Sequence, residues 1–82
     1  MEATVEISMY PLREDYEPAI LQFIEVIKRQ EQLSVRVNET STHLFGDFDL
    51  IFETLKNGIK TSFEKYGKVV FVMKVLNGNL KA

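Results

Sequence analysis

Residues 2–10 alternate between apolar and polar side chains with a period of two. One side carries Ala3, Val5, Ile7 and Met9, and the other carries Glu2, Thr4, Glu6, Ser8 and Tyr10. This alternation predicts a β-strand with one buried and one exposed face. Pro11 has no N–H to donate to a strand ladder, so we expect the strand to end there.

The next segment changes to a helical period. Apolar residues recur every three or four positions from Ile20 to Gln30, which predicts an amphipathic helix. Asp15 is the expected N-cap of this helix. Pro18 falls in its first turn, where the missing N–H costs little.

The second half of the chain repeats this order with one more strand. Residues 33–37 alternate, residues 38–41 are typical of a turn, and residues 42–45 predict a short strand, so the two strands form a hairpin. Asp47 is the expected N-cap of a second helix that ends at Gly67. Within that helix, Gly58 indicates a close approach to the sheet.

Residues 68–76 predict a fourth strand with apolar side chains on both faces. The order β-α-β-β-α-β and right-handed crossovers predict a single ferredoxin-like domain over residues 1–82. This α+β sandwich has a four-stranded antiparallel sheet and two helices on one face. Its first and third strands are central and its fourth lies at an edge. Because an edge strand that is apolar on both faces is unfavourable in a monomer, we expect a homo-oligomer that covers the sheet.

Composition excludes several functions. The chain has no cysteine, which excludes a disulfide scaffold, a thiolate zinc site, an iron–sulfur cluster and a Cys nucleophile. Its net charge is -2, so we expect no nucleic-acid partner. No segment reaches the ~20 apolar residues of a membrane span, and no secretory signal pattern is present. We therefore expect no membrane association and a cytoplasmic location.

Isolated titratable residues give little support for catalysis or metal binding. His43 is the only histidine, and no cluster of ligating residues surrounds it in the sequence. We interpret it as a structural strand residue and expect no metal, no cofactor and no enzymatic activity. Glu6 is of more interest, because it would lie in the middle of the exposed sheet face.

Polar residues that suit ligand binding gather at the end of the first strand and around the third strand. The candidate ligand-binding residues are Ser8, Tyr10, Ser41, Thr42, Phe45, Gly46, Asp47, Phe48 and Asp49. Because the first and third strands are neighbours, we expect these groups to converge on one hollow. Hydroxyls, carboxylates and aromatic rings together favour a flat, polar, cationic aromatic ligand. Which face of the third strand lines the hollow stays open. The alternative is that Asp47 only caps its helix and that Ser41 and Thr42 only complete the hairpin.

Two of these segments resemble the thiamine-binding family typified by YkoF. Residues 7–12, Ile-Ser-Met-Tyr-Pro-Leu, match its S-x-Y-P-L strand end, and residues 41–47, Ser-Thr-His-Leu-Phe-Gly-Asp, match its S-T-x-x-x-G strand. The acidic start of the following helix also fits, and the resemblance extends from Ala3 to about Val75.

The resemblance implies a ferredoxin-like fold that binds thiamine or its hydroxymethylpyrimidine part without catalysis. It further implies a cytoplasmic role in uptake or salvage of thiamine precursors, with single-copy members assembling into dimers or tetramers. The alternative function is an oligomeric regulatory or interaction domain of the same fold that does not bind thiamine.

Overall fold

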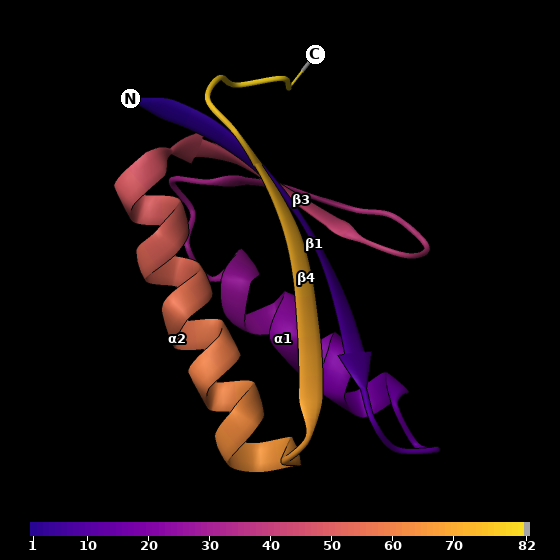
Figure 1. Ribbon diagram of the computed structural model, residues 1–82. Helices are drawn as coiled ribbons and strands as arrows, with labels where there is room; N and C mark the ends of the chain where they lie inside the picture. The colour runs from indigo at the N-terminus through magenta and orange to yellow at the C-terminus, as the bar shows by residue number, and fades with distance from the viewer. Residues whose placement is uncertain (82) are drawn as a thin grey trace.

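The computed structural model describes residues 1–81, which form a four-stranded antiparallel sheet with two helices on one face (Figure 1). The elements are β1 (Glu2–Pro11), α1 (Glu17–Lys28), β2 (Ser34–Val37), β3 (Thr42–Asp47), α2 (Phe48–Tyr66) and β4 (Val69–Leu76). The strand order is β2-β3-β1-β4, with β1 and β3 in the centre. This confirms the predicted α+β ferredoxin-like sandwich, including the edge position of β4.

The core lies between the sheet and the helices. On β1, Val5 and Ile7 point toward the helices and are fully buried. The core cluster consists of Ala3, Val5, Ile7, Phe23, Ile27, Leu33, Leu44, Ile51 and Leu55. The opposite side of the sheet, called the open face below, carries the even-numbered residues of β1. The predicted alternation of β1 is therefore confirmed.

Local signals fixed the start of α2 but not that of α1. Asp47 caps α2, because its Oδ2 accepts a hydrogen bond from the Leu50 N–H at 3.0 Å. The N-cap of α1 is Tyr16, with no side-chain cap bond, so the prediction for Asp15 was wrong. Tyr16 already has helical dihedrals, φ −90° and ψ −23°, and the helix therefore begins without a capping carboxylate. Helix α1 also starts and ends earlier than residues 20–30.

Gly58 marks a close approach, but to α1 rather than to the sheet. A Cβ atom built on Gly58 would lie 3.1 Å from Phe23 Cε1 and 3.3 Å from Ile27 Cγ2. Helix–helix contact, which periodicity within α2 does not show, therefore explains the residue. The glycine lets α1 and α2 pack side by side across the sheet.

The chain after β4 folds back over one end of the open face. Thr4 Oγ1 donates to the Gly78 carbonyl at 2.7 Å and accepts from the Leu80 N–H at 2.9 Å. Asn79 Nδ2 donates to Glu2 Oε1 at 3.0 Å. These bonds bury Thr4 on an otherwise exposed side of β1 and hold residues 78–80 beside the start of that strand (Figure 1).

The contact at Gly58 leads to a first prediction. We expect Gly58→Leu to lower the free energy of unfolding by about 1–3 kcal/mol, because the new side chain must displace Phe23 or Ile27. Urea denaturation measures the change. Lys60→Leu is the matched control, since Lys60 is exposed on the same helix. Equal stability of the two variants would contradict close packing at Gly58.

Candidate functional site

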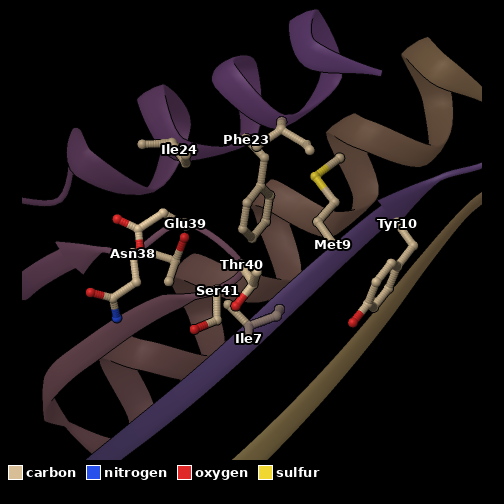
Figure 2. Close-up of a pocket in the computed structure, with 11 residues that line it drawn as sticks. Ile7, Met9, Tyr10, Phe23, Ile24, Asn38, Glu39, Thr40 and Ser41 are labelled. Carbon is tan, nitrogen blue, oxygen red and sulfur yellow. The ribbon is translucent and has the colours of Figure 1, made fainter. Parts of the chain in front are cut away.

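A pocket of about 220 Å³ lies between α1, the end of β1 and the turn that joins β2 to β3 (Figure 2). We call it the helix pocket. Its lining residues are Ile7, Met9, Tyr10, Ile20, Phe23, Ile24, Asn38, Glu39, Thr40, Ser41 and Thr42. The residues from α1 and β1 that face the pocket are apolar, whereas the polar groups come from the turn and from Thr42 at the start of β3. The pocket therefore has apolar walls and a polar rim, as many small-molecule sites do.

The strand register and the turn together position the polar rim. Ile7 pairs with Thr42, which places Thr42 on the helix side of the sheet, where it is buried. The Asn38 N–H donates to the Ser41 carbonyl at 2.8 Å and closes the turn. Hydroxyl, amide and carboxylate groups of four consecutive residues are thus held beside one apolar wall.

Of the residues proposed from the sequence, Ser41, Thr42 and Tyr10 border this pocket, but the Tyr10 side chain points away from it, to the open face (Figure 2). The expectation that Ser8 and Asp47 join Thr42 in one hollow was wrong. Ser8 pairs with Val72, and because side chains alternate along β1 it lies on the open face, away from the pocket. Asp47 pairs with Glu2 at the other end of β3 and caps α2.

The remaining predicted residues are also distant from the helix pocket. Phe45 points to the open face, Gly46 packs against Leu33, and Phe48 and Asp49 form the first turn of α2. Gly46 has φ +149°, and a Cβ there would lie 2.7 Å from Leu33 Cδ2. Its place in the motif is therefore explained by backbone packing in this chain.

Sequence reasoning missed the contribution of α1 and part of the turn. Ile20, Phe23 and Ile24 were assigned to the apolar stripe of a helix, but they also wall the helix pocket. Asn38 and Glu39 were taken only as turn residues. The signal that could have found them was their position immediately before the Ser41-Thr42 motif.

A second pocket, of about 270 Å³, lies on the open face, and we call it the sheet-face pocket. It is lined by Thr4, Glu6, Arg36, His43, Phe45, Lys74, Leu76 and Leu80. The Arg36 guanidinium lies 5.2 Å from the centre of the Phe45 ring. The His43 ring stacks on the same Phe45 ring, with 5.9 Å between the ring centres. The tail residue Leu80 borders this pocket, so the folded-back chain end helps to form it.

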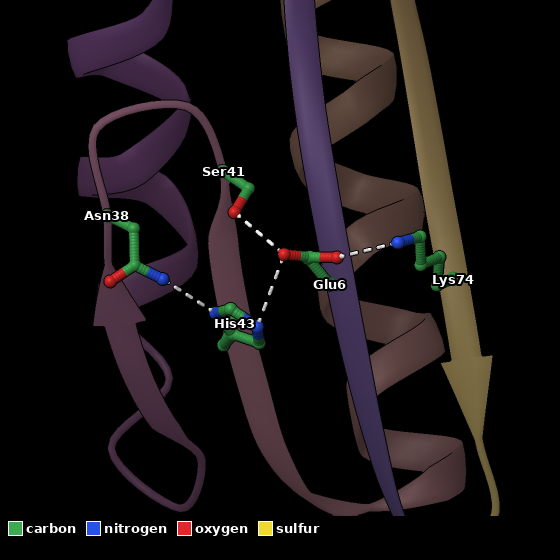
Figure 3. Close-up of polar contacts among 5 residues, drawn as sticks. All are labelled: Glu6, Asn38, Ser41, His43 and Lys74. Atoms are coloured by element: carbon green, nitrogen blue, oxygen red, sulfur yellow. Dashed lines mark hydrogen bonds and ion pairs between the residues drawn. The ribbon is translucent and has the colours of Figure 1, made fainter.

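A network of polar contacts centres on Glu6, which was singled out from its position in β1 (Figure 3). Glu6 Oε2 accepts from the Ser41 hydroxyl at 3.0 Å and lies 3.4 Å from His43 Nε2, while Lys74 Nζ lies 3.6 Å from Oε1. On its other side, His43 Nδ1 contacts Asn38 Nδ2 at 2.9 Å. We call these five residues the Glu6 network.

The Glu6 network defines a protonation state. The hydrogen bond from Ser41, together with the positive charge of Lys74, lowers the pKa of Glu6 despite partial desolvation. The carboxylate then favours a proton on His43 Nε2, because only a donor suits that contact. The neutral ring consequently offers Nδ1 as an acceptor, which matches the amide N–H of Asn38.

The part of the chain that the structure describes holds no group of three or more His, Cys, Asp or Glu side chains that could bind a metal ion. Within residues 1–81, no helix is both long and apolar enough to cross a membrane. Neither pocket, therefore, is built around a metal-ligating cluster.

The fold and the helix pocket define a small ferredoxin-like domain with a ligand-sized cavity, and comparison with known proteins places it in a family. The model of the YKOF-related family matches residues 2–79, so the chain belongs to that family. No curated protein sequence matches it.

Several solved structures are similar over nearly the whole chain. Protein SP2199 from Streptococcus pneumoniae is 24% identical, with a TM-score of 0.88 over 98% of this chain and 90% of that one. A hypothetical protein from Methanocaldococcus is 28% identical, with a TM-score of 0.83 over 99% of this chain and 84% of that one. TM0486 from Thermotoga maritima is 21% identical, with a TM-score of 0.85 over 95% of this chain and 85% of that one. It is provisionally described as a thiamine biosynthesis/salvage protein.

The hydrogen bond from Ser41 leads to a second prediction. The pKa of Glu6 should lie below its ordinary value of 4.5 and rise toward that value in Ser41→Ala. Because the folded-state pKa is lowered, Glu6 stabilises the fold above its ordinary pKa and loses this contribution as the pH falls through the folded value. Carboxyl ¹³C NMR measures the titration, with Ser8→Ala as control. The same midpoint in Ser41→Ala and wild type would contradict the network.

Proposed function

We propose that the protein binds thiamine, or its hydroxymethylpyrimidine part, in the helix pocket and catalyses no reaction on it. The carrying observation is that both motif segments line this pocket, with Ile7 and Met9 from the first and Ser41 and Thr42 from the second. Membership of the YKOF-related family and the likeness to the Thermotoga protein support this assignment. A role in thiamine-precursor uptake or salvage, and the cytoplasmic location, are parts of the same proposal.

The size of the helix pocket favours the pyrimidine end of the ligand. A dry apolar cavity of about 150 Å³ accommodates a benzene ring. The 220 Å³ of the helix pocket therefore suits one substituted aromatic ring rather than the whole of thiamine. The pyrimidine would lie against Phe23 and Ile24, and the thiazolium would extend toward the rim.

The rim supplies groups that match the polar atoms of such a ligand. An aminopyrimidine offers an amino donor and ring-nitrogen acceptors, and hydroxyl or amide groups such as those of Ser41, Thr42 and Asn38 can bond to either kind. The thiazolium carries a permanent positive charge. Glu39, exposed at the rim, is the carboxylate placed to balance it.

Titration calorimetry with thiamine tests this proposal and gives a third prediction. Thr42→Val keeps the shape of the side chain but removes its hydroxyl, and we expect about fivefold weaker binding, the worth of one hydrogen bond. Ser8→Ala is the matched control. This change also removes a hydroxyl from a central strand, but from its open face, and it should leave Kd unchanged.

Two results would contradict the assignment. Absence of saturable binding of both thiamine and hydroxymethylpyrimidine would reject the ligand class. Loss of affinity in Ser8→Ala, with none in Thr42→Val, would place the ligand on the open face instead of in the helix pocket.

We further propose that copies of the chain associate through the open face. Strand β4 exposes Val70, Val72 and Leu76 there, at 44%, 55% and 43% of their full surface. Tyr10 pairs with Val70 and extends this apolar strip onto β1. Such a strip on an unprotected edge strand favours burial against another subunit. The same surface supports the alternative function, an interaction domain that assembles but does not bind thiamine.

Light scattering provides the fourth prediction. The wild-type protein should have a mass that is a multiple of the 9.5 kDa chain. Val72→Glu should shift it to the monomer, because a carboxylate would be buried without a partner. Leu21→Glu, an exposed position on α1, is the control and should leave the mass unchanged. A monomeric wild-type protein would rule out this association.

A further inference from the structure

The turn at residues 38–41 takes part in both faces of the sheet. Asn38 and Ser41 border the helix pocket, yet their side chains also bond to residues of the open face (Figures 2 and 3). Ser41 donates to Glu6 at 3.0 Å and Asn38 contacts His43 at 2.9 Å. Since Glu6 and His43 also contact each other at 3.4 Å, the four side chains form a chain of contacts that begins and ends on the turn.

We propose that Glu6 and His43 are positioning residues for the helix pocket, and that the pocket loses affinity for a cationic aminopyrimidine when His43 takes up a second proton. They touch no ligand in this arrangement. They act through Ser41 and Asn38, whose side chains they hold at the rim. This inference rests on the proposed function, because it concerns the regulation of the same pocket.

The hydrogen-bonding pattern explains why protonation would alter the rim. In the neutral ring with its proton on Nε2, this N–H faces Glu6 Oε2 at 3.4 Å, and Nδ1 accepts from the Asn38 amide. A proton on Nδ1 would face the N–H group of Asn38, so that two donors oppose each other. The amide must then turn and offer its oxygen to His43. Its free donor and acceptor positions at the pocket rim are thereby exchanged.

Charge acts in the same direction. The charged groups that face His43 are Glu6 from β1 and Arg36 from β2, with Lys74 from β4 on the far side of Glu6. The Glu6 carboxylate already contacts Lys74 and Ser41, so its negative charge is partly balanced. An imidazolium therefore adds positive charge beside a turn that would hold a cationic ligand. Both effects predict weaker binding in acid.

By linkage, a ligand that binds better to the form with neutral His43 must disfavour the second proton on that ring. We expect about threefold weaker binding to the protonated form, which corresponds to a midpoint lowered by roughly half a pH unit. His43 is the only histidine, so its ring signals in NMR need no assignment. The fifth prediction is thus a lower His43 midpoint in the presence of saturating thiamine than in its absence.

Two variants separate positioning from a simple field effect. His43→Gln keeps a donor for Glu6 but does not titrate, so the part of the pH dependence of Kd caused by His43 should disappear. Asn38→Ala removes the link between His43 and the rim, and at saturating thiamine the displacement of the His43 midpoint should fall below half of the wild-type value. A purely electrostatic effect of the cationic ligand would leave that displacement intact.

The outcomes distinguish this inference from the proposed function. If thiamine does not bind at any pH, both are overturned. If thiamine binds but lowers the His43 midpoint by less than about 0.2 pH unit, or raises it, only the positioning role is overturned. An undiminished displacement in Asn38→Ala, or the wild-type pH dependence of Kd in His43→Gln, also overturns it. A lowered midpoint that depends on Asn38 supports it.

Discussion

The two-residue period of the central strand β1 is the constraint on which the rest of the structure depends. Because β1 is bonded to β3 on one side and β4 on the other, the side chains of its residues 4–7 are assigned to a face by two ladders. A slip by one residue would move Val5 and Ile7 out of the core and drive the Glu6 carboxylate into it. An ionised carboxylate without partners in an apolar core is far too costly, so the register is strongly specified.

That constraint also explains which parts could be predicted. The alternation in β1 is unambiguous, and the fold follows from it together with the order of elements. Strand β3 gives no such answer alone, since Leu44 and Phe45 are both apolar and Thr42 and His43 are both polar. Only the pairing of Thr42 with Ile7 decides its faces. For this reason the sequence identified the motif residues but not their faces. Ser8 was predicted to lie beside Thr42, whereas the strand pairing puts the two on opposite faces of the sheet.

Features that depend on contacts between elements could not be predicted from the sequence, for a similar physical reason. Asp47 was predictable because an N-cap acts on its own helix within a few residues. The contact of Gly58 with Phe23 depends on how α1 and α2 lie against each other. The same rotation of α1 turns Ile20 and Ile24 toward the turn and creates the wall of the helix pocket. Periodicity shows that these residues are apolar, but not which neighbour they meet.

The turn at residues 38–41 is free of the alternation that sorts the strands, and this freedom gives it a special position. A strand residue serves one face only: Thr42 borders the helix pocket, whereas His43 points to the open face. Ser41, placed just before β3, borders the pocket and reaches Glu6 with its hydroxyl. Any physical link between a ligand on the helix side and a partner on the open face must cross the sheet, and side chains of this turn already do so. Binding and assembly would therefore be independent only to the extent that this turn stays rigid.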